Sequence, residues 1–552
     1  MDTLTLVIQS AAALLTACGI AYGLIALWAA RAFERAARSV QADAGFAPPV
    51  SILKPVRGVD VRMYAGLVSH CLLQYAGEVE LLFGVSSLED PAVALVARLR
   101  VEYPKMDIRL VECPQMLGTN GKASNLAQMV PRARFEHVVV NDSDIRVSPQ
   151  YLSRVMAPFA AHTTGLVTVP YVGRAEWGLW SRLEALGIST DFMAGVLTAR
   201  LLEGGIRFGL GSTLATTRMA LAAIGGFEGL ADQLGDDYEL GARLSAAGYR
   251  VELVHEVVQT AVPAYSLRGF FEHQLRWARS TRDSRRAGYI GLGLTYVLPW
   301  ALATAVASGF SLWSLSLLSL ALLVRGTVAL AVGVGVLDDG QVLRDLLLLP
   351  LRDCLGLFFW VWSYASDEVV WRGERFRLER GELLRVEEER MARVPQAAVQ
   401  SMEAAAFSSD GAAVCGELVR QLRDRDKAVV EGAARMLKKI SKPDAKALYA
   451  WRKTLLEEAF RATDVRVQWN LSIVLGRLPL KGADKALAVE LMFERLRDKS
   501  GLNRTMAMQA LMDLSEDDAA LRSRVMPIVR EFVKDGTPAM KARARKLLKK
   551  VR

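Results

Sequence analysis

The feature that most constrains the fold of this chain is an apolar run near its N-terminus, residues 4–30. A helix that crosses a bilayer needs about 20 predominantly apolar residues, so this run predicts a membrane-spanning helix. A cleaved signal peptide is the alternative, but no basic segment precedes the run. The positive charge follows instead, as Arg31, Arg35 and Arg38, and the positive-inside rule places the downstream side in the cytoplasm.

Apolar segments return in the middle of the chain. Residues 290–310 and 312–336 are each long enough to span a bilayer, and residues 346–364 are a weaker third candidate. Charged residues lie inside two of them, at Arg325 and at Arg352-Asp353. An arginine at the bilayer centre costs at least about 2.5–3.5 kcal/mol, so we expect these charges to face protein, water or headgroups.

The strongly basic segment that follows, residues 371–377, should remain in the cytoplasm. This expectation leaves two alternatives for the third apolar segment. Either that segment is re-entrant or interfacial, or the number of membrane crossings differs from this count.

The composition supports membrane helices joined to soluble domains. The chain has 552 residues, too many for one hydrophobic core, with 52% hydrophobic and 23% charged residues. Its net charge of +10 suits nucleic acid, anionic lipid or phosphate-bearing substrates, and the membrane helices favour lipid and nucleotide phosphates over nucleic acid. The five cysteines have no CxxC spacing and the five histidines are scattered, so neither a zinc site nor a disulfide framework is indicated.

Two soluble regions have different patterns. Short apolar runs alternate with amphipathic helices between residues 48 and 287, which predicts an α/β domain with a mostly parallel sheet. The predicted strands are residues 51–53, 79–85, 108–111, 138–140 and 166–169.

The polar region 405–552 contains a repeat with a period of about 36–38 residues, whose units open at Asp426, Asp464, Ser500 and Gly536. Small and apolar residues recur at helical spacing after each start, which is typical of an all-α, HEAT-like solenoid that binds protein on its concave face. An irregular helical bundle is the alternative. The predicted organisation is a membrane helix at 1–30, the α/β domain with an interfacial helix at 48–287, membrane helices at 288–368, a basic juxtamembrane segment and linker at 369–404, and the repeats at 405–552.

The strongest chemical motif is the sequence Val-Val-Val-Asn-Asp-Ser-Asp at residues 138–144. A buried strand ends there in Asp142-x-Asp144, and alternate residues at a strand end can both reach a cation beyond the sheet edge. A divalent metal at this place would bridge a diphosphate and neutralise charge on the leaving group. The alternative is a turn that the aspartates stabilise.

Two further pairs lie later in the α/β region. Asp236 and Asp237 precede a helix, where one carboxylate could act as general base and the other could cap the helix. Capping alone is the alternative, and it accounts for one aspartate better than for two. Arg276-Trp277 places a guanidinium beside an aromatic ring, which suits a diphosphate, whereas the arginines around it suit a helix on anionic headgroups.

Weaker candidates precede these motifs. Lys122 and Asn125 lie in a glycine-containing loop ahead of a helix, where a phosphate contact is reasonable, although the P-loop sequence is absent. Glu89 and Asp90 follow a strand, where they could hold a base or a ribose, or only begin the next helix.

The combined motifs resemble those of the inverting GT-A glycosyltransferases, specifically the ceramide glucosyltransferase branch with its bacterial relatives that act on hopanoid lipids. The resemblance covers roughly residues 1–385 and leaves the repeats outside. In chain order it rests on Ser51-Ile52-Leu53-Lys54-Pro55 with Gly58, Glu89-Asp90, Lys122 with Asn125, Asp142-x-Asp144, Gly211-Ser212-Thr213, Gly225-Gly226-Phe227, Gly235-Asp236-Asp237-Tyr238, Arg276-Trp277, and Trp371-Arg372-Gly373 with Phe376-Arg377.

The resemblance implies an α/β GT-A domain, a UDP-sugar donor, a membrane lipid acceptor and Mg²⁺ or Mn²⁺ as cofactor. Asp142 and Asp144 would hold the metal against the diphosphate, and Asp237 would be the base. Arg276 and Trp277 would close over donor and acceptor. The remaining expected substrate contacts are Lys54, Glu89, Asp90, Lys122, Asn125 and Asp142, with Asp236 beside the base.

One departure from the family's motifs affects the expected reaction product. The broader QxxRW motif has glutamine where this chain has His273, with Gln274 shifted by one. Processive synthases use that motif to grip a growing polymer, so the departure favours transfer of a single sugar. The alternatives are a processive polysaccharide synthase, a polyprenyl-phosphate glycosyltransferase and a non-enzymatic membrane scaffold that uses the repeats. We expect an integral protein of the bacterial inner membrane with a cytoplasmic catalytic domain and a protein partner at the repeats.

Overall fold

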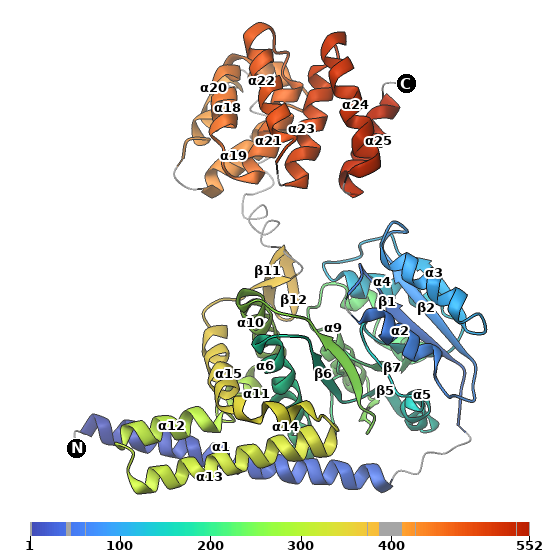
Figure 1. Cartoon of the computed structure of the whole chain (residues 1–552), viewed down its shortest axis with the longest axis vertical. Helices are drawn as coiled ribbons and strands as arrows, with labels where there is room; N and C mark the ends of the chain where they lie inside the picture. Colours follow the sequence, from blue (N-terminus) through green and yellow to red (C-terminus); the bar gives the residue numbers. More distant parts are fainter. Residues whose placement is uncertain are drawn as a thin grey trace. The chain divides into compact units, whose positions relative to one another are not determined.

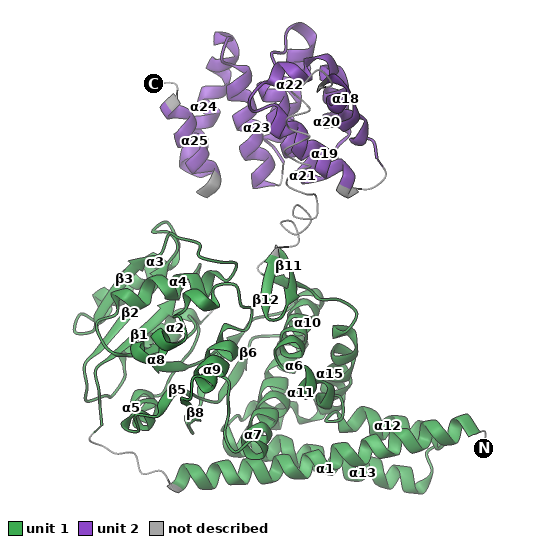
Figure 2. Cartoon of the chain, turned by 180° about the vertical axis from the view of Figure 1, so that it is seen from behind, with its two compact units in different colours: residues 1–388 green, residues 389–552 purple. Residues whose placement is uncertain are grey.

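A computed structural model describes residues 3–39, 46–60, 62–371, 374–385, 411–424, 427–498, 500–536 and 538–550. The chain forms two units, residues 1–388 and residues 389–552 (Figure 2). The first unit contains the predicted α/β domain together with the apolar helices. The second unit is helical throughout the described residues.

The first unit contains a mixed sheet of seven strands, counted over the described residues, which lies to one side of the unit's apolar helices (Figure 1). Its order is β3-β2-β1-β4-β7-β5-β8, and only β7 runs antiparallel to its neighbours. The strands are β1 Val50–Pro55, β2 Val79–Val85, β3 Asp107–Glu112, β4 His137–Val140, β5 Thr164–Thr168, β7 Leu214–Thr217 and β8 Arg250–Leu253. All five predicted strands are confirmed and lie in β1 to β5, so the predicted α/β fold with a mostly parallel sheet is confirmed.

Helices cover this sheet because its apolar strands must be buried on both faces. In the described residues α4 packs on β1 and β2, α9 packs on β5 and β8, and a second parallel pair, β6 with β9, lies beside the sheet. The bounds are α2 Met63–Cys71, α3 Ala92–Glu102, α4 Gly121–Met129, α5 Tyr151–Met156, β6 Tyr171–Ala175, α8 Arg218–Ala223, α9 Asp236–Ala246 and β9 Val258–Val262.

Long apolar helices form the other part of the first unit. Within the described residues, four are long and apolar enough to cross a bilayer, at Thr3–Arg38, Leu179–Leu202, Leu312–Val336 and Gln341–Ser363. A fifth crossing is formed if Arg286–Leu292 and Val297–Ala307, bent by 45° at their junction, count as one span. The sequence did not indicate Leu179–Leu202, and the predicted span at residues 290–310 contains the bend.

The α1 helix packs along the later apolar helices, as Figure 1 shows for α12 and α13. The remaining bounds in this part are α1 Thr3–Ser39, α6 Leu179–Gly187, α7 Met193–Leu202, α10 Leu267–Ser284, α11 Arg286–Leu292, α12 Val297–Ala307, α13 Leu312–Ala329, α14 Gln341–Asp345 and α15 Leu349–Ser363. At Gly23 a Cβ atom would lie 2.5 Å from Val324 Cγ1, so the missing side chain permits the close packing of α1 on α13.

The charges inside the apolar helices form an ion-pair network. Arg325 Nε donates to Asp353 Oδ1 at 3.0 Å, and Arg325 Nη2 pairs with Asp191. Arg352 Nε lies 3.2 Å from Asp191 Oδ2. The expectation that these charges face protein is therefore confirmed.

Residues 368–385 contain strands that the sequence did not indicate. Here β10 Glu368–Trp371, β11 Glu374–Glu379 and β12 Glu382–Arg385 form an antiparallel sheet, hereafter the small sheet. The sequence predicts a basic juxtamembrane segment and linker at residues 369–404, and the described part of this range contains these strands. Arg372, Gly373 and residues 386–404 lie outside the described residues.

The second unit consists of helices in all its described segments, as predicted. Asp464 and Ser500, two of the predicted repeat starts, cap α21 and α23 by accepting from backbone N–H groups, and Gly536 ends α24. Asp426 lies outside the described residues, and the HEAT-like repeat stays a prediction. The helices are α18 Gly411–Gln421, α19 Lys427–Ile440, α20 Arg452–Arg461, α21 Val465–Arg477, α22 Gly482–Arg495, α23 Gly501–Leu514, α24 Ala519–Asp535 and α25 Pro538–Lys550.

The ion-pair network should contribute to the free energy of unfolding. We expect Arg325→Met to destabilise the protein by about 3–5 kcal/mol, because it leaves Asp353 buried without its partner. The double variant Arg325→Met/Asp353→Leu should recover most of that loss, since an apolar pair of similar volume replaces the ion pair. Thermal unfolding in detergent measures both effects. A single variant as stable as the wild type would show that the network is not formed.

Candidate active site

Most of the predicted site residues surround one cavity in the first unit, with a volume of about 1010 Å³. It lies where β4 and α4 meet the start of α9, at the carboxyl edge of the sheet. Eight of the predicted residues line it: Lys122, Asn125, Asp142, Asp144, Asp236, Asp237, Arg276 and Trp277. Lys54, Glu89 and Asp90 do not line this cavity.

Asp142 and Asp144 reach the cavity because the end of β4 is anchored beneath them. Asn141 is fully buried, and its side-chain Nδ2 donates to the carbonyl of Ser212 at 2.8 Å. Asp144 Oδ2 accepts from Thr260 Oγ1 at 2.6 Å and from Ala261 N at 2.8 Å, so it is held by β9. Burial raises the pKa of Asp144 above its usual value.

Lys122 neutralises part of this acidic cluster. The side chain of Asn120 caps α4 by accepting from Lys122 N at 2.9 Å, which starts the helix at this place. Lys122 Nζ lies 2.7 Å from Asp142 Oδ1 and 3.7 Å from Asp236 Oδ2. Burial alone would lower the pKa of Lys122, but the Asp142 and Asp236 carboxylates outweigh it and raise that pKa.

Asp236 and Asp237 form the first turn of α9. Asp237 Oδ1 accepts from Tyr238 N at 2.8 Å, and a Cβ atom on Gly211 would lie 2.8 Å from Asp237 Oδ2. The glycine therefore makes room for the carboxylate. Burial, followed by repulsion from Asp236, raises the pKa of Asp237 to about 6. Burial also raises the pKa of Asp236, whose Oδ2 is buried without a hydrogen-bond partner.

Helix α10 carries the basic and aromatic side of the cavity. Trp277 packs against Phe192 and His273, with ring centroids 5.9 and 5.4 Å apart. His273 Nδ1 lies 3.3 Å from Glu184 Oε1, and Gln274 Nε2 also donates to Glu184. The two residues that depart from the QxxRW motif thus fix α10 against α6.

Lys54 and Asp90 lie outside the cavity lining and support neighbouring loops. Lys54 is fully buried and donates from Nζ to the carbonyl of Asp142 at 3.0 Å, so it supports the end of β4. Asp90 Oδ1 accepts from Gly58 N at 2.8 Å and from Ala92 N at 2.9 Å, which joins two loops. Glu89 is exposed beside Asp90.

Several cavity residues were not predicted as site residues. Tyr171 and Thr260 line the cavity from β6 and β9, Tyr265 lines it from the loop before α10, and Trp371, which the resemblance included without a role, lines it from the small sheet. None belongs to a run of chemically reactive residue types. Only the fold brings them to the aspartates.

The acidic cluster fits a divalent cation that a substrate helps to bind. No group of three or more His, Cys, Asp or Glu side chains in the described part of the chain is arranged to hold a metal by itself. Mg²⁺ usually binds one or two carboxylates and completes its shell with waters and substrate phosphates. Asp142 and Asp144 supply two such carboxylates, and burial raises the pKa of Asp144 and of the neighbouring Asp236.

Comparison with known proteins identifies the family. The model of Glycosyl transferase family 21 matches residues 11–384, which include every predicted site residue. The chain belongs to this family. The match confirms the resemblance to glycosyltransferases and leaves the C-terminal unit outside.

Individual relatives are more distant. Ceramide glucosyltransferase 1 of Caenorhabditis elegans is 26% identical over 235 residues, which cover 42% of this chain and 49% of the relative. Beta-monoglucosyldiacylglycerol synthase of Synechocystis sp. is 26% identical over 216 residues, 38% of this chain and 42% of the relative. The chain thus spans about half the length of the curated relatives it matches. A mannosyltransferase of Pyrobaculum calidifontis, solved with GDP-Man and Mn²⁺, superposes with a TM-score of 0.42 at 21% identity, over 65% of this chain and 97% of that chain.

The raised pKa of Asp237 predicts a pH-dependent stability difference. Between pH 4 and 6 the unfolded chain ionises this group and the folded chain does not, so its contribution to stability falls as pH rises through about 6. We expect Asp237→Asn to be more stable than the wild type by about 1–2 kcal/mol at pH 7.5 and equally stable near pH 4. Thermal unfolding at both pH values measures this. Glu112→Gln, at an exposed carboxylate, should show no such difference.

Proposed function

We propose that the protein transfers one sugar from a UDP-sugar to the hydroxyl group of a membrane lipid, with inversion at the anomeric carbon and with Mg²⁺ or Mn²⁺. The observation that carries the proposal is the extent of the cavity. Its polar end holds the aspartates, and its other end is lined by residues of the apolar helices, including Gly19, Val297 and Val324. A cavity with these two ends suits an amphiphile whose hydroxyl reaches Asp237.

The reaction follows from the positions of the side chains. Asp237 accepts the proton of the acceptor hydroxyl as its oxygen forms a bond to the anomeric carbon. The bond from that carbon to the diphosphate breaks on the opposite face, and the diphosphate leaves with the electron pair. Arg276 and Lys122 line the cavity and supply positive charge for the departing diphosphate. A divalent cation on Asp142 and Asp144 would supply further charge stabilisation there.

The relatives support a lipid acceptor, since one is called a ceramide glucosyltransferase and another a glucosyldiacylglycerol synthase. Ceramide, a hopanoid or a diacylglycerol would all fit this chemistry. A processive polysaccharide synthase or a polyprenyl-phosphate glycosyltransferase is the competing enzyme class. Arg31, Arg35 and Arg38, in the C-terminal part of α1, support a cytoplasmic site in a bacterial inner membrane.

The direct test is an assay of the detergent-solubilised protein with a panel of UDP-sugars and total lipid extract, with and without EDTA. We expect a glycolipid product that disappears on chelation and returns with Mg²⁺ or Mn²⁺. A polymer, a sugar phosphate lipid, or no product with any donor would contradict the proposal.

The role of Asp237 has its own test. We expect Asp237→Asn to lower transfer by at least about 100-fold, because the base is lost, while the affinity for UDP-sugar is retained. In the wild type, kcat/KM should fall about tenfold per pH unit below pH 6, since the base must be ionised. Loss of donor binding in Asp237→Asn would refute this assignment, as would a rate that is independent of pH between 5 and 7.

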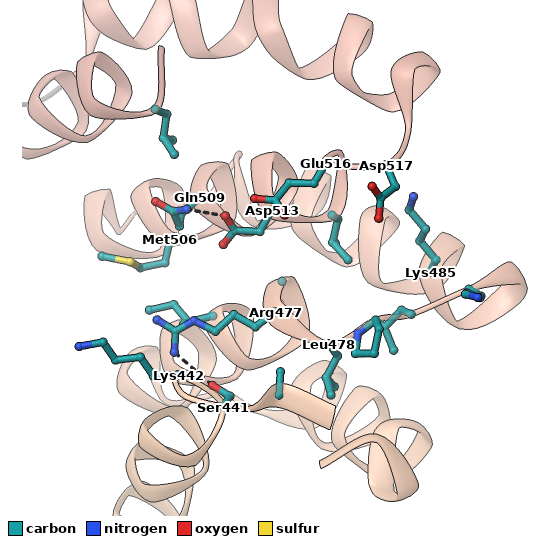
Figure 3. A pocket seen from close by; sticks show the side chains of 18 of the residues that line it. Ser441, Lys442, Arg477, Leu478, Lys485, Met506, Gln509, Asp513, Glu516 and Asp517 are labelled. Carbon is teal, nitrogen blue, oxygen red and sulfur yellow. Dashed lines mark hydrogen bonds between the residues drawn. The ribbon is translucent and has the colours of Figure 1, made fainter. Parts of the chain in front are cut away.

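We further propose that the second unit binds an acidic segment of a partner protein in a groove of about 1040 Å³. In Figure 3, Lys442 and Arg477 face Met506, Gln509 and Asp513 across this opening. Lys442, Lys481 and Lys546 line the groove without an ion pair among the described residues, whereas Lys485 pairs with Asp518 at 2.9 Å. Burial, followed by repulsion from Arg435 and Arg477, lowers the pKa of nearby Lys438 to about 8. This excess of cations favours an anionic partner, and a groove suits a peptide better than a flat bilayer.

A fluorescent peptide of repeated Asp-Glu-Leu units tests this proposal on the full-length protein. We expect it to bind, an Asn-Gln-Leu peptide not to bind, and Lys442→Glu/Lys546→Glu to weaken binding about tenfold. The control Lys446→Glu/Lys534→Glu makes the same charge change on exposed residues outside the groove. Equal weakening by the control, or binding only to vesicles of phosphatidylglycerol, would contradict the proposal.

A further inference from the structure

The small sheet contacts the segment that leads into the catalytic acids. Leu383 N donates to the carbonyl of Asp232 at 2.8 Å, and Leu234 N donates to the carbonyl of Gly381 at 2.9 Å. Gln233 and Glu382 form an antiparallel bridge between these two hydrogen bonds. Residues 232–234 therefore pair with β12 as an additional strand would, and the chain enters α9 with Asp236 two residues later.

Side chains reinforce this backbone pairing. Leu234 is 8% exposed and packs with four residues of the small sheet: Val369, Phe376, Leu378 and Leu383. The core of the small sheet therefore includes a residue of the segment that leads into α9. Because Leu234 also lines the cavity, a shift of the small sheet would move the wall of the active site.

The opposite side of the same segment is held by the loop that precedes α4, the helix of Lys122. Thr119 N donates to Asp232 Oδ1 at 2.8 Å, and Asn120 Nδ2 donates to the carbonyl of Gln233 at 2.8 Å. Asn120 is also the cap of α4, two residues before Lys122. Residues 232–234 are thus hydrogen-bonded on one side to the loop before α4 and on the other side to β12.

The small sheet is in turn fixed to α10, the helix of Arg276 and Trp277. Arg279 Nη1 donates to the carbonyl of Glu368, Arg282 pairs with Asp367, and the Asp283 carboxylate accepts from Gly381 N. The small sheet therefore joins the two parts of the site that lie on opposite sides of the cavity.

The geometry points to the small sheet as a positioning element of the active site, with Leu234 and Gly381 as its positioning residues. This inference rests on the proposed function, because it assigns the element to the placement of Asp236 and Asp237 for transfer. The small sheet sets the distance between the acid pair on α9 and the Arg276-Trp277 pair on α10. It acts through these residues and contributes Trp371 to the cavity wall.

Leu234→Ala tests the side-chain contact. We expect kcat to fall about 10–100-fold, because a small misplacement of a catalytic group has an effect of this size, with the KM for UDP-sugar changed less than about threefold. Leu234→Met should restore most of the rate, since it refills the space in the small sheet. An unchanged kcat in Leu234→Ala, or a loss that appears only in KM, would overturn the inference.

A comparison of substitutions at Gly381 and Gly248 tests the same inference if Leu234→Ala does not fold. Gly381 has φ of +85°, and its Cβ atom would lie 2.4 Å from Oε1 of the buried Gln233. Gly248 has φ of +92°, with no atom within 4 Å of its Cβ position. Gly381→Ala and Gly248→Ala therefore share the backbone strain, and only the first disturbs residues 232–234. We expect kcat to fall at least about tenfold in the first relative to the second.

Amide hydrogen exchange of residues 231–238 separates this inference from the proposed function. We expect faster exchange in Gly381→Ala than in Gly248→Ala, whether or not the wild type transfers a sugar. Equal exchange in the two variants would overturn the positioning role. Absence of transfer by the wild type with every donor would instead refute the proposed function.

Discussion

The active site depends on one cation, Lys122, placed between two acidic segments that are far apart in the sequence. Its ammonium group contacts Asp142 at the end of β4 and Asp236 at the start of α9. At an effective dielectric constant of 20, two unit charges 4 Å apart interact by about 4 kcal/mol. Without Lys122 the half-exposed Asp142 and the buried Asp236 would lack this shared cation. With it, the two acidic segments are held together beside the cavity, where Asp142 and Asp144 could bind a divalent cation.

The same unit must also place this polar site against apolar helices. The ion pairs of Arg325 with Asp353 and Asp191 allow charged residues to lie among these helices. Close packing at Gly23 brings α1 against α13. The cavity therefore continues from the aspartates to residues of the apolar helices, and this continuity supports the proposal of a lipid acceptor.

The predicted strands were found because each contains neighbouring apolar residues, although β3 also carries Arg109 and is only partly buried. Strands β7 and β8 were missed because polar residues make up half of each. Among the predicted site residues, Asp142, Asp144, Asp236 and Asp237 line the cavity, and acids at strand ends and helix starts are conspicuous in a sequence. Lys54 and Asp90, predicted as substrate contacts, do not line it in the described structure, and a motif does not report the direction of a side chain.

The sequence by itself determined the local elements, the apolar helices and the residue types of the acidic cluster, because hydrophobic period and charge act over a few residues. The tertiary structure decided which of these groups share one cavity. It also decided that a segment expected to be a basic linker forms strands against residues 232–234 and completes its core with Leu234. Such pairing depends on backbone groups about 150 residues apart, and no local pattern encodes contacts between them.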